Sequence, residues 1–159
     1  MRVTLLCVGK IKEHYWREAL AEYEKRLSRY CRTEIIEVAD EKTPDGASAS
    51  LEEQIREKEG ARLLHALSED SYVITLEIAG KKLSSEQFAG ELSRLAVSGK
   101  SHITFVIGGS LGLGKSVLAK ADYRLSFSDM TFPHQMMRVI LCEQIYRAFR
   151  IINHEPYHK

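Results

Sequence analysis

The sequence HITFVIGGSLGLG, residues 102–114, joins six residues that are almost all apolar to a loop that contains four glycines. A short apolar run that ends at glycine is typical of a strand buried on both faces of a sheet. The glycines allow the backbone that follows to turn and to approach a ligand closely. The stretch therefore predicts a central strand whose carboxyl end opens into a binding loop.

Apolar runs of the same kind alternate with helical patterns along the rest of the chain. Further strands are predicted at Val3–Val8, Ile35–Val38, Tyr72–Ile78 and Tyr123–Phe127. Helices are predicted at Tyr15–Tyr30, at Leu51–Leu67 after a cap at Ser50, from a cap at Ser84 or Ser85 to Gly99, and at Gln135–Ile152. This alternation indicates an α/β fold, with a mainly parallel sheet and helices on both of its faces. The 159 residues are expected to form one domain, 1–159.

Three predicted strands end in segments that we expect to lie close together, because ligands in parallel sheets bind beyond the carboxyl ends of the strands. These segments are Leu76–Gly80, Ile107–Gly114 and Phe127–Phe132. Gly80 is expected to turn the chain after its strand.

The last predicted helix is apolar around most of its circumference, and only Glu143, Arg147 and Arg150 form a polar stripe. A helix of this kind must be buried on nearly all sides. In a chain of this size one side can pack on the sheet, and the other side then needs a second copy of the chain. The pattern predicts a two-fold homodimer. The alternative is a central core helix in a monomer.

Charge is unevenly distributed, although the net charge is only +1. Residues 1–80 hold 12 Lys and Arg against 16 Asp and Glu, whereas residues 81–159 hold 11 against 6. A solvated acidic helix at Leu51–Glu59 would explain this difference. A phosphate-facing surface in the C-terminal half is the other explanation.

Several classes of site are not predicted. Three cysteines without a CxxC pair argue against a disulfide framework and against a thiolate zinc site, and favour a reducing compartment. His134, His154 and His158 share no i, i+4 pairing on a predicted helix, because His154 and His158 follow the last helix, and carboxylates near them are few, so we expect no metal site. No apolar stretch approaches the roughly 18 residues of a membrane span, and the N-terminus lacks a signal-peptide pattern. We expect a cytoplasmic protein without a metal or a membrane partner.

The segment Gly109–Ser116 matches the phosphate-binding pattern G-x-x-x-x-G-K-[ST], between a predicted strand and a predicted helix start. A P-loop domain needs several parallel strands after this loop, and only one short strand follows here. A strand that ends in an acid for magnesium is also missing. A small P-loop-like nucleotide-binding protein is therefore the alternative hypothesis for function.

Four separated motifs resemble one known family. They are Ile107-Gly108-Gly109-Ser110-x-Gly112, the run Leu125–Arg138, Glu143-Gln144-Ile145-Tyr146-Arg147-Ala148, and the terminal Pro156-Tyr157-His158-Lys159. Together with the start Val8-Gly9-Lys10, they are similar to the ribosomal RNA large subunit methyltransferase H family of the SPOUT class, over essentially the whole chain.

The resemblance implies a methyltransferase that takes its methyl group from S-adenosylmethionine (SAM). It implies a C-terminal trefoil knot around the cofactor and an obligate homodimer. The implied substrate is N3 of a pseudouridine in the subunit-interface stem-loop of 23S rRNA, within the assembled 70S ribosome. The residues that it implies as cofactor contacts are Leu76, Gly108, Phe127, Ser128, Asp129, Met130, Thr131 and Phe132.

The imide N3–H of a uracil-like ring must lose its proton before or during methyl transfer. The family places its C-terminal tail close to the target base, which implies His158 as the base or as a group that positions it. Tyr157 is expected to stack or hydrogen-bond, and Arg138 to stabilise the developing charge, with His134 nearby at the start of the last helix. The alternative for the tail is a frayed, solvated terminus. The alternative for His134 is a residue of the first helical turn whose polar atoms are satisfied by the backbone.

The more basic C-terminal half is expected to contact the RNA phosphates. Its candidate residues are Lys81, Lys82, Arg124, Arg147, Arg150 and Lys159.

Overall fold

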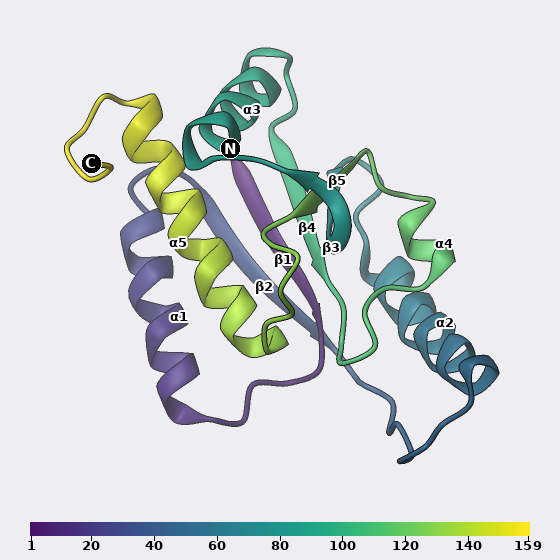
Figure 1. The fold of residues 1–159 in the computed structure, drawn as a ribbon. Helices are drawn as coiled ribbons and strands as arrows, with labels where there is room; N and C mark the ends of the chain where they lie inside the picture. The colour runs from purple at the N-terminus through teal and green to yellow at the C-terminus, as the bar shows by residue number, and fades with distance from the viewer.

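The computed structural model describes residues 1–159 and confirms the predicted alternation of strands and helices (Figure 1). The strands are β1 (Arg2–Val8), β2 (Arg32–Val38), β3 (Tyr72–Lys82), β4 (His102–Ile107) and β5 (Tyr123–Ser126). The helices are α1 (His14–Leu27), α2 (Ala49–Ala66), α3 (Ser85–Val97), α4 (Lys115–Leu118) and α5 (His134–Ile152).

The five strands form one parallel sheet in the order β2-β1-β4-β3-β5. β4 is the central strand, and all six of its residues are buried, as its apolar sequence predicts. Because β5 lies beyond β3, the chain between β4 and β5 passes across β3. The parallel arrangement brings the carboxyl ends of all strands to one edge of the sheet.

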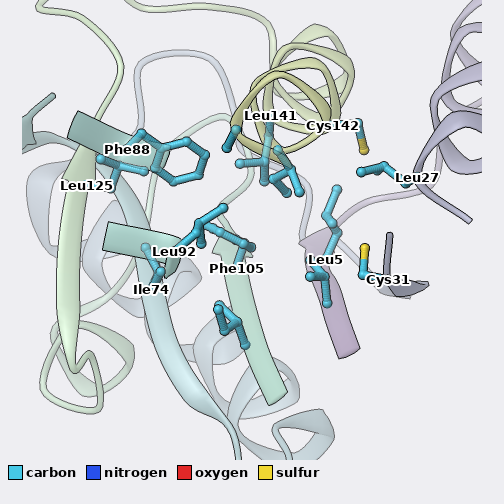
Figure 2. Close-up of a cluster of buried hydrophobic side chains, with 14 of the residues drawn as sticks. Leu5, Leu27, Cys31, Ile74, Phe88, Leu92, Phe105, Leu125, Leu141 and Cys142 are labelled. Carbon is cyan, nitrogen blue, oxygen red and sulfur yellow. The ribbon is translucent and has the colours of Figure 1, made fainter. Parts of the chain in front are cut away.

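Helices cover both faces of the sheet (Figure 1). The larger core lies under α1, α3 and α5, and it includes Leu5 and Phe105 from the strands and Leu141 and Cys142 from α5. Figure 2 shows the strand side chains pointing toward Leu141 and Cys142. The smaller core lies on the other face, where Leu63 of α2 and Val117 of α4 pack with strand residues of opposite parity. Because side chains alternate along β1 and β4, these two strands contribute residues to both cores.

β3 differs from its prediction, because it continues to Lys82 and does not end at Ile78. The register of its pairing with β5 shifts between Leu76 and Lys81. The prediction that Gly80 turns the chain is therefore wrong. A Cβ at Gly80 would lie 2.6 Å from the backbone carbon of Leu125, so glycine is needed there for close strand approach.

The predicted start of α2 also shifts, since the side chain of Ser48, rather than Ser50, accepts a hydrogen bond from the N–H of Leu51. Ser84 caps α3 in a complete capping box with Gln87, which confirms one of the two predicted caps.

α5 packs between α1 and α3 and buries one face against the sheet (Figure 1). Leu141, Ile145 and Ala148 on that face have no exposed surface. Apolar residues around the rest of the helix are only partly buried in a single chain, among them Met136, Met137, Val139, Ile140, Ile151 and Ile152. One chain therefore leaves part of the apolar circumference of α5 open.

Candidate functional site

A cavity of about 520 Å³ lies at the edge of the sheet where the carboxyl ends of β3, β4 and β5 meet. The three strand ends predicted to surround a ligand all contribute to its lining. The residues that line it are Leu76, Glu77, Ile78, Ile107, Gly108, Gly109, Ser110, Leu111, Gly112, Leu113, Phe127, Ser128, Met130, Thr131, Phe132, Pro133, His134 and Met137. Half of these side chains are apolar, and the glycines add bare backbone.

The glycine loop after β4 folds tightly on itself. The N–H of Gly112 donates to the carbonyl of Gly109 over 3.1 Å, and Gly112 has a φ of +80° that favours glycine. A Cβ at Gly108 would lie 2.6 Å from the backbone carbon of Gly112. Any side chain at Gly108 would therefore displace the loop that forms one wall of the cavity.

Two glutamates of α2 support this loop from behind. A Cβ at Gly109 would lie 3.1 Å from the carboxylate of Glu59, and one at Gly114 would lie 2.6 Å from that of Glu57. Glu57 also accepts hydrogen bonds from the backbone N–H and the hydroxyl of Ser116. The hydroxyl bond is the main cause of the lowered pKa of Glu57.

The far end of the loop does not form a phosphate site, although it completes the P-loop pattern. The hydroxyl of Ser116 is bound to Glu57, and the ammonium of Lys115 lies 3.9 Å from a Glu53 oxygen. A carboxylate at the start of α4 repels phosphate at the point where a P-loop attracts it. This geometry argues against the nucleotide-binding hypothesis.

The segment that follows β5 forms the opposite wall. The hydroxyl of Ser126 donates to the carbonyl of Ser128, and the N–H of Met130 donates to the hydroxyl of Ser128 over 3.0 Å. Met130 is 74% exposed and Phe132 is 37% exposed. These bonds hold a rim of large apolar side chains at the mouth of the cavity.

Seven of the eight predicted cofactor residues line the cavity, and Asp129 is the exception. The Asp129 carboxylate forms an ion pair with Lys82 outside the cavity. The resemblance singled out Gly108 alone from the loop as a cofactor contact. The binding loop predicted from the glycine spacing, Ile107–Gly114, lines the cavity from Ile107 to Leu113.

His134 also lines the cavity, at the start of α5. Burial, with a smaller contribution from the Arg138 charge, lowers the pKa of His134 below its usual value of 6.5. Its ring is therefore neutral at physiological pH and can accept or donate one hydrogen bond.

Arg138 does not line the cavity, which argues against its expected role as a charge stabiliser at the target base. Its side chain has no exposed surface. The guanidinium bonds to Glu37 over 2.6 Å and donates to the carbonyls of Val8 and Gly9 over 2.9 and 2.8 Å. Both terminal nitrogens of Arg138 thus tie α5 to the end of β1 and to Glu37, while its buried Nε has no hydrogen-bond partner.

The C-terminal tail is held by contacts rather than frayed. The Arg147 guanidinium lies 4.7 Å from the centre of the Tyr157 ring, and the Tyr157 hydroxyl donates to Glu143 over 3.1 Å. Burial and the nearby Glu143 raise the pKa of Tyr157 to about 12. Arg150 donates to the carbonyl of Pro156 over 2.8 Å.

His158 lies between an arginine and a glutamate. Its Nδ1 is 3.2 Å from the Arg147 guanidinium, and its Nε2 is 2.7 Å from the Glu86 carboxylate. Arginine can only donate and a carboxylate can only accept, so the arrangement favours the tautomer with hydrogen on Nε2. Hydrogen bonds from the Glu86 N–H, from Ser84 and from His158 lower the pKa of Glu86 to about 2.

One chain does not bring the tail and the cavity together. The cavity lies at the start of α5, and Figure 1 shows that the tail follows the end of this helix. The 19 residues of this helix span roughly 28 Å at 1.5 Å per residue. The tail folds back along this helix, because Tyr157 binds Glu143 and His158 binds Arg147, roughly 14 and 20 Å along the axis from His134. No residue of the tail lines the cavity.

Comparison with known proteins assigns the family. The family model described as "Predicted SPOUT methyltransferase" matches residues 1–158. This chain belongs to the SPOUT methyltransferase family.

Two relatives, from Clostridium beijerinckii and Bifidobacterium adolescentis, are both called "Ribosomal RNA large subunit methyltransferase H" and are 57% and 59% identical to this chain. The alignment covers all of both chains in each case. A probable methylase family protein from Haemophilus influenzae has a TM-score of 0.55 at 16% identity, over 99% of this chain and 70% of that one. A probable methyltransferase from Bordetella pertussis has a TM-score of 0.56 at 12% identity, over 92% and 95%. The two structures share the fold with this SPOUT chain.

The SPOUT chain has no group of three or more His, Cys, Asp and Glu side chains that could hold a metal ion. None of its helices has the length and hydropathy needed to cross a bilayer. Burial raises the pKa of all three cysteine thiols, with Cys7 at about 12 and Cys31 at about 11. These thiols are protonated at neutral pH, which argues against a nucleophilic cysteine.

Most of the cations that were expected to contact RNA are engaged with carboxylates. Lys82 pairs with Asp129, Arg124 with Glu77, Arg147 with Glu143, and Arg150 with Glu155. Lys81 and Lys159 form no such pair. Four of the six candidate cations are therefore held in ion pairs within the chain.

Proposed function

We propose that this chain is a SAM-dependent methyltransferase of large-subunit ribosomal RNA, which methylates N3 of a pseudouridine in the subunit-interface stem-loop of 23S rRNA in the assembled 70S ribosome. The observation that carries the proposal is the cavity at the three strand ends, because seven residues implied as cofactor contacts line it together. The names of full-length relatives support the rRNA substrate. That substrate favours a cytoplasmic location.

The lining fits SAM in size and chemistry. A volume of about 520 Å³ lies within the roughly 300 to 1,000 Å³ of small-molecule sites. Leu76, Ile107 and Phe127 supply apolar surface for an adenine ring, and the glycine loop supplies backbone groups without side chains in the way. The Gly108–Gly112 backbone, the Phe127–Phe132 segment and Leu76 would hold the cofactor. When bound, the cofactor supplies a methyl group on a sulfonium, which is the electrophile.

The protein must align the acceptor nitrogen and remove its proton. The free lone pair of His158 lies on Nδ1, where Arg147 now donates, so Arg147 has to release this contact before Nδ1 can accept the proton. Tyr157 stays protonated at neutral pH, since its pKa is about 12, and serves as a hydrogen-bond donor rather than a base. In this proposal His158 is the base, and Arg147 and Glu86 position it.

A homodimer completes the site. In one chain no tail residue lines the cavity, and Tyr157 and His158 bind Glu143 and Arg147, which lie roughly 14 and 20 Å along α5 from His134 at 1.5 Å per residue. A partner whose α5 runs antiparallel places its tail beside this cavity and covers the half-buried apolar residues of α5. The exposed Met130 and Phe132 at the rim offer further apolar surface to such a partner.

We also propose that the C-terminal half forms the trefoil knot of the SPOUT class. Two features support a knot around the cavity. The chain crosses β3 between β4 and β5, and it then returns as α5 to the other face of the sheet from α4.

Two measurements test the function. Titration calorimetry should show SAM binding to the intact protein and no binding of ATP with magnesium. Gly108→Ala should weaken SAM binding at least tenfold, because its Cβ would displace Gly112.

Mass spectrometry of ribosomes from cells that lack this chain should show one unmethylated pseudouridine, which the purified protein methylates on 70S particles. Binding of ATP without SAM, or unchanged methylation in those cells, would overturn the proposal.

A further inference from the structure

The segment that joins β1 to α1 and the first turn of α1 carry three exposed cations near the cavity. Lys10, Lys12 and Arg17 are all exposed, and none has a carboxylate within ion-pair distance. The segment contains one acid, Glu13. This contrasts with the C-terminal half, where four of six candidate cations are paired. We call residues 10–17 the basic loop, although residues 14–17 form the first turn of α1.

The basic loop is fixed to the body of the protein at its start. The N–H of Gly9 donates to the carbonyl of Val38 over 2.8 Å, and Arg138 binds the carbonyls of Val8 and Gly9. The N–H of Ile11 donates to Glu37 over 3.1 Å, and the Ile11 side chain is 7% exposed in the main core. Because Ile11 is anchored inward, its neighbours Lys10 and Lys12 are presented outward on a rigid backbone.

The rest of the loop is also ordered. The Arg17 guanidinium donates to the carbonyl of Lys12 over 3.2 Å, which folds the arginine back toward the loop. Tyr15 is 61% exposed, and its ring packs edge-on against Trp16 with the centres 5.1 Å apart. An exposed aromatic ring beside unpaired cations is the combination that binds unpaired nucleotides, through base stacking and phosphate contact.

The basic loop begins at the same sheet edge as the cavity. It leaves the carboxyl end of β1, next to β4. A Cβ at Gly9 would lie 3.6 Å from Nε2 of His134, which lines the cavity. A nucleotide chain that brings a base to the cavity mouth therefore passes close to the start of this loop.

We infer that the basic loop contacts the phosphate backbone of the rRNA that flanks the target nucleotide, with Tyr15 available for stacking. This inference rests on the proposed function and names the surface that holds its substrate. A groove of about 620 Å³ beside the loop is lined by Lys10 and Arg17 but also by Glu24 and Glu37. These carboxylates disfavour phosphate inside the groove, so the contacts are assigned to the outward side of the loop.

The test compares two triple variants with the same loss of charge. Lys10→Gln, Lys12→Gln and Arg17→Gln together remove the cations of the loop. Lys58→Gln, Lys100→Gln and Lys120→Gln remove three exposed, unpaired cations on α2, before β4 and after α4, and serve as the matched control. For each protein we would measure the SAM dissociation constant, the KM and kcat on 70S ribosomes, and the salt dependence of ribosome binding.

The loop variant should keep its SAM affinity and its kcat at saturating ribosomes, and its KM should rise at least tenfold. The slope of log K against log salt should fall by about 3, since each phosphate contact contributes roughly one unit. The control should match the wild type. Tyr15→Leu should raise KM by several fold, whereas Tyr15→Phe should not.

Several results would overturn the inference. An unchanged KM in the loop variant excludes the surface, while wild-type methylation of the same ribosomes shows that the proposed function stands. A loss of SAM affinity in the loop variant would assign the loop to the cavity instead. A higher KM with an unchanged salt slope would indicate a ribosomal protein as the contact. A wild-type protein that neither binds SAM nor methylates ribosomes overturns the proposed function, and this inference with it.

Discussion

Subunit mixing tests whether the cavity of one chain works with the tail of another. The first variant, Gly108→Ala, damages the cavity, because its Cβ would lie 2.6 Å from the Gly112 backbone. The second lacks Tyr157–Lys159 and so loses the expected base. Each homodimer should be inactive. A mixed dimer has one damaged cavity and one missing tail. Whether an intact site remains depends on whether a cavity works with the tail of its own chain or with the tail of its partner.

The position of the tail on α5 predicts the outcome. The tail of one chain contacts α5 roughly 14 to 20 Å from His134 and does not line the cavity of that chain, so in the proposed dimer an intact site combines the cavity of the truncated chain with the tail of the Gly108→Ala chain. Random pairing makes about half of the dimers mixed, and each mixed dimer has one working site of two, so about one quarter of wild-type activity is expected. A site built within one chain gives no activity in any dimer.

The assay measures methyl transfer to 70S ribosomes from the separate variants and from the two variants after exchange of subunits. Native mass spectrometry counts the mixed dimers, and thermal melting shows that each variant is folded. Activity that rises with the fraction of mixed dimers supports the shared site. Mixed dimers that form but remain inactive would refute it, as would a truncated homodimer that keeps full activity.

Three further outcomes follow from single contacts. Arg138→Met should lower the free energy of unfolding by about 3 kcal/mol, measured in urea, because it leaves the carbonyls of Val8 and Gly9 without a donor. Gly80→Ala should lower the melting temperature through its clash with the Leu125 backbone, whereas Gly90→Ala on α3, which has open space, should not. Burial raises the pKa of Glu59, so the native state binds its proton more tightly than the unfolded state, and stability falls as pH rises above 4.5. Glu59→Gln should therefore be more stable than wild type at pH 7, and this gain should disappear below pH 4; a gain that persists in acid contradicts the cause.

The sequence predicted the layers of the fold well because the apolar pattern carries this information locally. The six residues of β4 are apolar at nearly every position, and all six are buried. The end of β3 was predicted less well. The pattern Glu77-Ile78-Ala79-Gly80 reads as the end of a strand, but β5 approaches closely enough at Gly80 for pairing to continue to Lys82. A contact with a strand more than 40 residues away leaves no local signal.

Ion pairs between distant residues also leave no local signal in the sequence, so the charge count could not locate the proposed RNA-binding surface. The count of 11 cations against 6 anions in residues 81–159 indicated a phosphate-facing surface. Arg124 pairs with Glu77 across two neighbouring strands, and Lys82 pairs with Asp129. Composition counts both partners of such pairs but says nothing of their distance. Unpaired cations lie in both halves, at Lys81, Lys100, Lys120 and Lys159 but also at Lys10, Lys12 and Arg17, in the half whose balance is negative.

Arg138 connects these two regions. The carbonyls of Val8 and Gly9 lie where β1 ends and are buried, so they need donors from outside the sheet ladder. A fixed fork of guanidinium donors from α5 supplies two of them and also reaches Glu37. The same turn of α5 presents His134 and Met137 to the cavity. The buried Arg138 side chain thereby holds the cavity wall and the start of the basic loop in a fixed arrangement. In the proposed function, this arrangement lets the enzyme hold an RNA backbone and present one of its bases.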